Sequence, residues 1–150
     1  MSKSIALAED DSDDQLLFTE ALKHVCKTTT LAIVENGMMM LDLLEKHMDS
    51  LPDVIILDVN MPGMSGIECL KIIRVTKGLD HLPVIIMSTS ANPKTIDDAF
   101  HSGANSYAVK PGKYEDLKSI VEKIINTDWR SSVDYNSRAT FMMKPASASR

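Results

Sequence analysis

The sequence predicts an α/β fold in which a parallel sheet is covered by helices on both faces. Short apolar runs alternate five times with longer stretches that carry apolar residues at helical spacing. The runs contain few polar residues, which is typical of strands buried on both faces rather than on one. Right-handed crossovers between parallel strands leave few topologies. We therefore expect a flavodoxin-like, five-stranded parallel sheet with strand order 2-1-3-4-5.

The predicted strands are the apolar runs, at residues 5–8, 31–34, 54–57, 83–87 and 106–109. The middle run, residues 54–57, is mostly β-branched and fits the centre of a sheet. Asp58 follows it at once, and Asn60, Pro62 and two glycines come soon after. The backbone is therefore expected to turn directly after Asp58.

Helices are predicted after each strand, at about residues 16–25, 38–48, 67–77, 93–102 and 114–125. The fourth has the clearest start, because Asn92 is a favourable cap and Pro93 suits the first helical position. Gly103 ends it. From residue 126 the pattern dissolves, so we expect one folded domain over residues 1–126 and a polar tail over 127–150 with no separate output domain. Trp129 is expected to dock on its own domain.

Composition narrows the choice of partners. The chain has 150 residues and a net charge of −5, with no basic stripe to meet phosphates, so nucleic acid is not an expected partner. No apolar run approaches the length of about 20 residues that a membrane span needs, and no membrane association is expected. Cys26 and Cys69 lack metal-ligand spacing, and we expect both to be buried free thiols in a reducing cytoplasm.

Polar side chains follow four of the predicted strands. Glu9 and Asp10 follow the first strand and Asp58 follows the third. Ser88 follows the fourth strand and Lys110 follows the fifth. Because the carboxyl ends of parallel strands meet at one edge of the sheet, where ligands bind in such folds, these five side chains are expected to form a site.

The residue types indicate phosphoryl chemistry at this edge. Three neighbouring carboxylates repel one another unless a cation or protons intervene, and oxygen ligands suit Mg²⁺. Lys110 adds a positive charge and Ser88 a hydroxyl donor. Such groups can stabilise the charge of an incoming phosphoryl group while Asp58 attacks it in line. The product would be an aspartyl phosphate.

Taken together, these motifs resemble the receiver domain of two-component response regulators. The resemblance covers residues 4 to about 125 and rests on Glu9-Asp10, the segment from Asp58 to Gly66, Ser88 and Lys110-Pro111. Asp13-Asp14, the loop 76–82 and residues 103–107 are most similar to small stand-alone regulators, including those paired with bacterial phytochromes. The resemblance implies that residues 1–126 are a receiver domain.

The resemblance also implies a role for each site residue. Asp58 would be the phosphoacceptor, while Lys110 and Ser88 would grip the phosphoryl group. Asp10, Asp58 and the backbone carbonyl of Asn60 would bind Mg²⁺ directly, and Glu9 would bind it through water.

Outside this site, Tyr107 would be an aromatic switch that swings inward when Ser88 moves to the phosphate. The Lys110-Pro111 bond is usually cis in this family. Two departures are visible: Ser88 replaces a commoner Thr, and Gly112-Lys113 follows where an apolar residue is usual.

Three other interpretations fit the sequence less well. An EF-hand would use the carboxylates at residues 9, 11, 13 and 20, but its sixth position is Asp14 where a Gly is needed. A haloacid-dehalogenase-type phosphatase needs a second Asp where this chain has Asn60, which cannot serve as a general acid. A pseudo-receiver that acts as a constitutive adaptor would be expected to have lost the acidic pair or Lys110.

The function predicted from the sequence is therefore that of a single-domain response regulator in a phosphorelay. It would accept a phosphoryl group on Asp58 with Mg²⁺, and would catalyse only its own phosphorylation and dephosphorylation. The expected phosphodonor is a histidine kinase or a histidine phosphotransfer protein. The signal would leave through contact with a downstream protein, and homodimerisation is left open.

Overall fold

The computed structural model describes residues 3–130 and 140–149 of the chain. Strands and helices alternate from the N-terminus, and a short strand and a 3-10 helix follow the last helix. The strands are β1 (Ser4–Ala8), β2 (Thr30–Val34), β3 (Val54–Leu57), β4 (Val84–Ser88), β5 (Ser106–Val109) and β6 (Met142–Met143). The helices are α1 (Ser12–Val25), α2 (Gly37–Lys46), α3 (Gly66–Val75), α4 (Pro93–His101), α5 (Tyr114–Asn126) and the 3-10 helix η3 (Ala146–Ser149).

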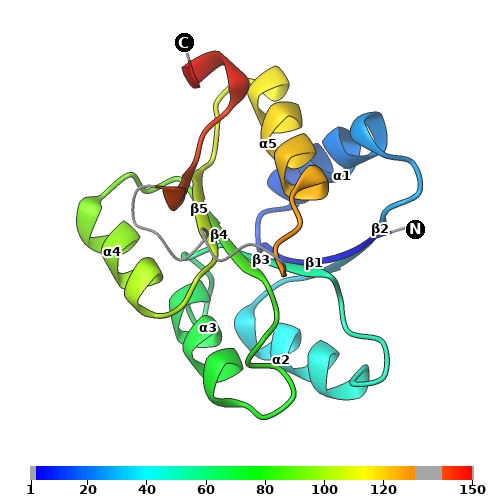
Figure 1. Cartoon of the computed structure of the whole chain (residues 1–150), viewed down its shortest axis with the longest axis vertical. Coiled ribbons are helices and arrows are strands. Elements are labelled where there is room, and N and C mark those ends of the chain that lie inside the picture. The colour runs from blue at the N-terminus through cyan, green and yellow to red at the C-terminus, as the bar shows by residue number, and fades with distance from the viewer. Residues whose placement is uncertain (1–2, 131–139, 150) are drawn as a thin grey trace.

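All strand pairs in the sheet are parallel, and the strand order is β2-β1-β3-β4-β5-β6. The order 2-1-3-4-5 predicted from the sequence is thus confirmed. The sixth strand was not expected. It pairs with β5 in the register Tyr107 to Met142 and Ala108 to Met143, so that β5 is covered on both sides. Figure 1 shows this C-terminal segment running beside β5.

Two apolar cores lie on opposite faces of the sheet, because successive strand residues point to opposite sides. In β3, Ile55 and Leu57 belong to the core under α2, α3 and α4, while Val54 and Ile56 belong to the core under α1 and α5. Figure 1 shows α1 and α5 together on one side of the sheet and α2 and α3 on the other. All four residues of β3 are buried, as its unbroken apolar run predicted.

Side-chain caps fix where the helices begin, and therefore where the loops at the functional edge end. Asp11 caps α1 and Asn36 caps α2 through hydrogen bonds from the backbone N–H of the third residue of each helix. Ser65 and Glu68 form a reciprocal capping box at the start of α3. Asn92 caps α4 with Pro93 in its first turn, as the sequence predicted.

Part of the segment expected to be a polar tail packs on the domain. Trp129 is buried in the core under α1 and α5, and its Nε1–H donates to the Ile124 carbonyl at 3.1 Å. The docking of Trp129 on its own domain is thus confirmed. Phe141 is fully buried in the opposite core. Residues 131–139 and 150 of the expected tail lie outside the described residues.

Within residues 3–130 and 140–149, the helices are too short or too polar for any of them to cross a membrane.

The two cysteines differ in environment, and the expectation that both are buried is wrong for Cys26. Cys26 is only partly buried because it ends α1 in the loop before β2, whereas Cys69 lies in the core. Hydrogen bonds from Thr28 and Thr29 lower the pKa of the Cys26 thiol to about 7. Burial raises the pKa of the Cys69 thiol to about 12.

This difference predicts selective alkylation of the native protein. At pH 7 we expect iodoacetamide to modify Cys26, because the thiolate is the nucleophile and about half of this thiol is ionised at its pKa. Cys69 should stay unmodified until the protein is unfolded in urea, where both should react. Mass spectrometry of tryptic peptides measures the extent of labelling at each cysteine in the native and in the unfolded protein. Equal labelling of the two cysteines in the native state would contradict the assignment.

Candidate phosphoryl-transfer site

The carboxyl ends of the strands bring the predicted polar residues to one edge of the sheet. Glu9, Asp58 and Lys110 each stand one residue beyond a strand, and Ser88 is the last residue of β4. Backbone hydrogen bonds of the sheet continue through these positions: Asp58 N–H donates to the Ala8 carbonyl at 3.1 Å and Lys110 N–H to the Ser88 carbonyl at 2.7 Å. The functional side chains are therefore held by the sheet itself.

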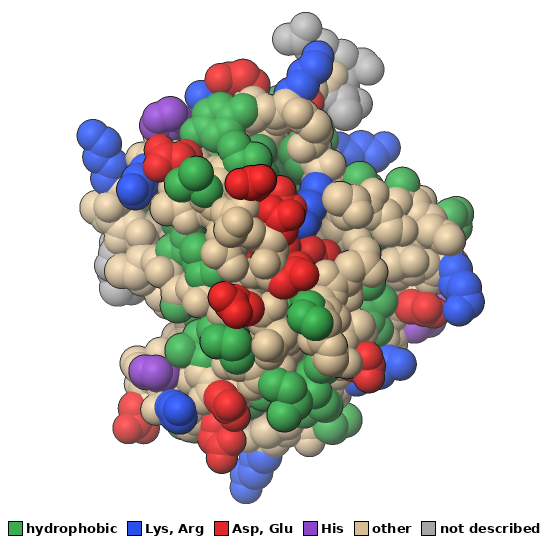
Figure 2. All heavy atoms as spheres, turned by 180° about the vertical axis from the view of Figure 1, so that it is seen from behind, with side chains coloured by type: hydrophobic (Ala, Val, Ile, Leu, Met, Phe, Trp, Pro, Cys, Tyr) green, Lys and Arg blue, Asp and Glu red, His purple; other side chains and the backbone are tan. Residues whose placement is uncertain are grey.

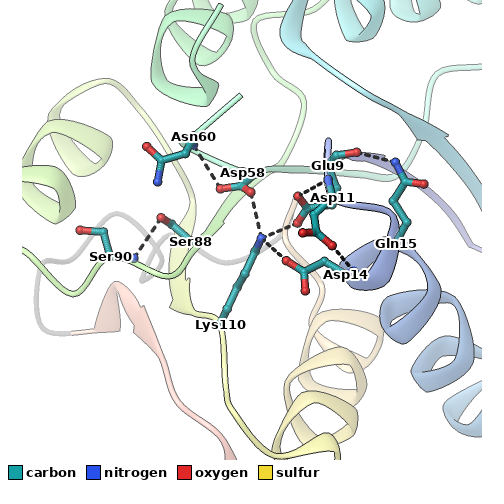
Figure 3. A network of polar contacts seen from close by, with 9 residues as sticks. All are labelled: Glu9, Asp11, Asp14, Gln15, Asp58, Asn60, Ser88, Ser90 and Lys110. Atoms are coloured by element: carbon teal, nitrogen blue, oxygen red, sulfur yellow. Dashed lines mark hydrogen bonds and ion pairs between the residues drawn. The ribbon is translucent and has the colours of Figure 1, made fainter. Parts of the chain in front are cut away.

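Lys110 lies at the centre of the site. Its ammonium group donates to Asp58 Oδ2 at 2.8 Å, to Asp14 Oδ2 at 2.9 Å and to Glu9 Oε1. Figure 3 shows the Lys110 side chain reaching between these three carboxylates; two of them directly follow β1 and β3, and the third lies in α1. An ammonium group has three hydrogens to donate, so each has a carboxylate partner.

Burial determines the charges in this cluster. Glu9 and Asp58 are only 3% and 6% exposed. Desolvation raises the pKa of Glu9 to about 7, although the hydrogen bond from Lys110 opposes this. Burial by itself would lower the pKa of Lys110, but its hydrogen bonds to Asp58, Glu9 and Asp14 outweigh that effect and raise it. The lysine therefore stays charged and is the internal counter-ion of the site.

Three carboxylates lie close enough together to hold a divalent cation. Glu9, Asp10 and Asp58 each offer an oxygen, and these oxygens lie within 4.8 Å of one another. Asp10 is exposed while the other two are buried, so the group opens to solvent on one side. Hard carboxylate oxygens in an open group fit Mg²⁺, which keeps several waters when it binds to proteins. Figure 2 shows acidic side chains gathered in the middle of one face of the molecule.

A second set of hydrogen bonds joins Ser88 to Tyr107. The Ser90 backbone N–H donates to Ser88 Oγ at 3.2 Å, and the Tyr107 hydroxyl donates to the Ser90 carbonyl at 2.7 Å. Ser88 and Tyr107 are both fully buried, and burial raises the pKa of the Tyr107 hydroxyl. Tyr107 thus takes the inward position that the resemblance associates with the switched state.

The loop after β3 requires a glycine at position 66. A Cβ there would lie 2.1 Å from the Asp58 carbonyl oxygen, a backbone atom that cannot move aside easily. The Gly66 N–H donates to the Val59 carbonyl at 3.1 Å, and the Asn60 N–H donates to Asp58 Oδ1 at 3.2 Å. These contacts close the loop tightly around the Asp58 carboxylate and set its orientation.

The structure brings together Glu9, Asp10, Asp58 and Lys110 as the sequence predicted, with Ser88 on the neighbouring strand. The backbone N–H of Asn60 contacts the Asp58 carboxylate. Ligation of a metal ion by the Asn60 carbonyl stays a prediction. The described residues contain no cis peptide bond, so Lys110-Pro111 is trans, contrary to the usual form in the family.

Sequence reasoning missed two contributors and left one alternative that the structure excludes. Asp14 is not among the predicted site residues, but it contacts Lys110. Gln15 donates from its Nε2 to the Glu9 carbonyl at 2.6 Å. The acidic run before the first helix was the signal for Asp14. An EF-hand is excluded because residues 12–25 form helix α1, so a calcium loop over 9–20 cannot form.

Comparison with known proteins is consistent with this geometry. The family model described as "response regulator receiver domain" matches residues 5–122. The chemotaxis protein CheY of Pseudomonas aeruginosa is 34% identical over 120 residues, covering 80% of this chain and 94% of that protein. The two-component response regulator ARR17 of Arabidopsis thaliana is 33% identical over 132 residues, covering 81% and 84%.

Solved structures show the same similarity. The phosphorylated cyanobacterial phytochrome response regulator RcpA has a TM-score of 0.76 and 31% identity, over 83% of this chain and 91% of that one. The Mn²⁺-bound response regulator Rcp1 has a TM-score of 0.73 and 30% identity, over 87% and 96%. The chain therefore belongs to the response regulator receiver domain family. It is a receiver domain of two-component signalling with an acidic pocket at Glu9, Asp10 and Asp58.

The lysine-centred cluster predicts a specific loss of stability in Lys110→Met. The substitution leaves two buried carboxylates without their counter-ion, so the free energy of unfolding should fall by about 3 kcal/mol in thermal or urea unfolding. The matched control is Lys118→Met, because Lys118 pairs with Glu115 on the surface and should change stability by less than about 1 kcal/mol. Equal effects of the two substitutions would show that the Lys110 contacts do not hold the site together.

Proposed function

We propose that the protein is a single-domain response regulator of a phosphorelay and that Asp58 is its phosphoacceptor. The observation that carries the proposal is the position of Asp58: a buried carboxylate at a strand end, hydrogen-bonded to Lys110 and beside two further carboxylates. The chain belongs to a family of signalling phosphoacceptor domains, which gives this arrangement of carboxylates and lysine a function. The neighbour RcpA, whose structure is that of a phosphorylated protein, supports the same assignment.

In this proposal the donor is a phosphohistidine of a histidine kinase or of a histidine phosphotransfer protein. A carboxylate oxygen of Asp58 attacks the phosphorus in line, a P–O bond forms and the P–N bond of the donor breaks. The electron pair of the P–N bond returns to the imidazole nitrogen, which takes a proton from solvent. Hydrolysis by water later regenerates Asp58 and inorganic phosphate.

The residues around Asp58 have distinct tasks in this transfer. Lys110 already contacts Asp58 Oδ2 and is near enough to follow the negative charge onto the phosphoryl oxygens. Ser88 supplies a hydroxyl donor, and its oxygen accepts a hydrogen bond from the Ser90 N–H. The tight Asp58–Gly66 turn holds the nucleophile in one orientation, so little rearrangement is needed before attack.

Magnesium is the cofactor of this proposal. Asp10, Asp58 and the Asn60 carbonyl would hold the ion directly and Glu9 through water, and the bound ion would neutralise negative charge on the transferring phosphoryl group. The oxygen-only donor set of the acidic pocket supports this choice. The Mn²⁺-bound form of the neighbour Rcp1 supports a divalent ion in general.

The output of the proposed regulator is a protein–protein contact. Phosphorylation would draw Ser88 toward the phosphoryl group and hold Tyr107 inward, which alters the face formed by α4, β5 and α5. A downstream protein or a second copy of the chain would read that face. The net charge of −5 disfavours nucleic acid. We place the protein in the cytoplasm, where its two free cysteines would stay reduced.

The first test uses beryllofluoride, which mimics a phosphoryl group on a carboxylate. With Mg²⁺ present, we expect it to shift the backbone amide resonances of Ser88 and Tyr107 in the wild type, because both groups follow the charge on Asp58. Asp58→Asn should bind no beryllofluoride and show no such shifts. Trp129 fluorescence, recorded in the same titration, reports whether residues after α5 sense the site.

A matched control is Asp53→Asn, a carboxylate at the opposite end of the sheet that accepts from Ser4 N–H. It should bind beryllofluoride as the wild type does. Transfer of radiolabel from a phosphorylated histidine kinase tests the physiological donor. If the folded wild type shows no response to beryllofluoride and accepts no label, the phosphoacceptor role is refuted and the constitutive adaptor remains.

A further inference from the structure

The segment after α5 returns to the sheet beside the residue expected to be the switch. Phe141 lies one position before β6, and its carbonyl accepts from Tyr107 N–H at 3.1 Å and from Ser106 Oγ at 2.8 Å. Its ring lies 6.4 Å from the Tyr107 ring and 5.1 Å from the Phe100 ring of α4, centre to centre. Both Phe141 and Tyr107 are fully buried. The C-terminal segment therefore completes the packing around Tyr107.

Without this segment, β5 would be the edge strand of the sheet. Tyr107 lies on the face of β5 that packs toward α4, together with Phe141 in one core. Phe141 packs beside Tyr107 in this core, and the Phe100 ring of α4 lies against Phe141.

A chain of contacts connects this packing to the site. Phe141 packs against Tyr107, the Tyr107 hydroxyl donates to the Ser90 carbonyl, and the Ser90 N–H donates to Ser88 Oγ. Ser88 stands on β4 beside Asp58, and Lys110 N–H donates to its carbonyl. Every contact in this series joins residues that the structure describes, and Phe141 is the residue at its far end from Asp58.

We propose that Phe141 is a positioning residue that holds Tyr107 in its inward state, so that docking of the C-terminal segment and phosphorylation of Asp58 favour each other. This rests on the proposed function, in which a phosphoryl group at Asp58 also favours inward Tyr107. Two events that stabilise the same state must each strengthen the other by the same factor. The segment is thus a built-in effector of the receiver domain rather than a passive tail.

The test compares full-length variants by their affinity for beryllofluoride with Mg²⁺. Phe141→Ala removes the ring and should weaken apparent binding about fivefold or more, within the usual range of coupling between sites. Phe141→Leu refills most of the volume and should restore most of the affinity. Phe141→Val serves as the intermediate variant if Ala does not fold, with folding checked by circular dichroism.

Two further variants separate positioning from simple destabilisation. Ser147→Ala removes the hydrogen bond of the same segment to Asp116, which does not touch Tyr107, and should bind as the wild type does. In a Tyr107→Ala background, Phe141→Ala should have no additional effect, because the residue through which it acts is gone. NMR of the Tyr107 ring should show more solvent exposure in Phe141→Ala alone.

The results distinguish this proposal from the one on which it rests. If the wild type binds beryllofluoride and folded Phe141→Ala binds it equally well, with an unchanged Tyr107 ring, the coupling is refuted while the phosphoacceptor role stands. An equal loss with and without Tyr107 would also refute it, since the effect would not pass through that residue. A wild type that does not bind at all refutes the proposed function instead.

Discussion

The ion cluster around Lys110 is the interaction on which the site depends. Burying Glu9 and Asp58 side by side would be costly without a cation, and the ammonium group satisfies both together with Asp14. The cost of desolvation remains visible in the raised pKa of Glu9. A site with this much buried negative charge is suited to two kinds of ligand. One kind brings a cation with it, and the other replaces the carboxylates as the partner of Lys110. The stability of the site and the reactivity proposed for Asp58 therefore have the same physical origin.

The parallel sheet makes the cluster possible because it brings the ends of distant segments to one edge. Glu9, Asp58 and Lys110 are separated by about fifty residues at each step, yet each follows directly on a strand. The strands are anchored by two apolar cores, so their ends cannot shift independently. Gly66 adds a local constraint, since a side chain there would displace the backbone of Asp58 itself.

The sequence was sufficient to predict the sheet order and the edge residues, because buried strands and their polar ends leave strong local patterns. The contact of Asp14 with Lys110 was not predicted, because it depends on how far the Lys110 side chain reaches and sequence spacing does not show this. The sixth strand escaped because two residues make no periodic pattern, and its partner β5 lies more than thirty positions earlier. Cys26 was misjudged because its exposure follows from the end of α1 rather than from residue type.

The sixth strand also changes how the proposed output face has to be understood. A receiver domain ending at α5 would present β5 as an edge strand. The unpaired backbone N–H and C=O groups of an edge strand can pair with another chain. Here a segment of the same chain takes that position and buries Phe141 beside Tyr107. Any partner that reads β5 must therefore either recognise β6 as part of the surface or displace it. Under the coupling proposed above, such a partner would also respond to the inward state of Tyr107, because Phe141 packs against that ring.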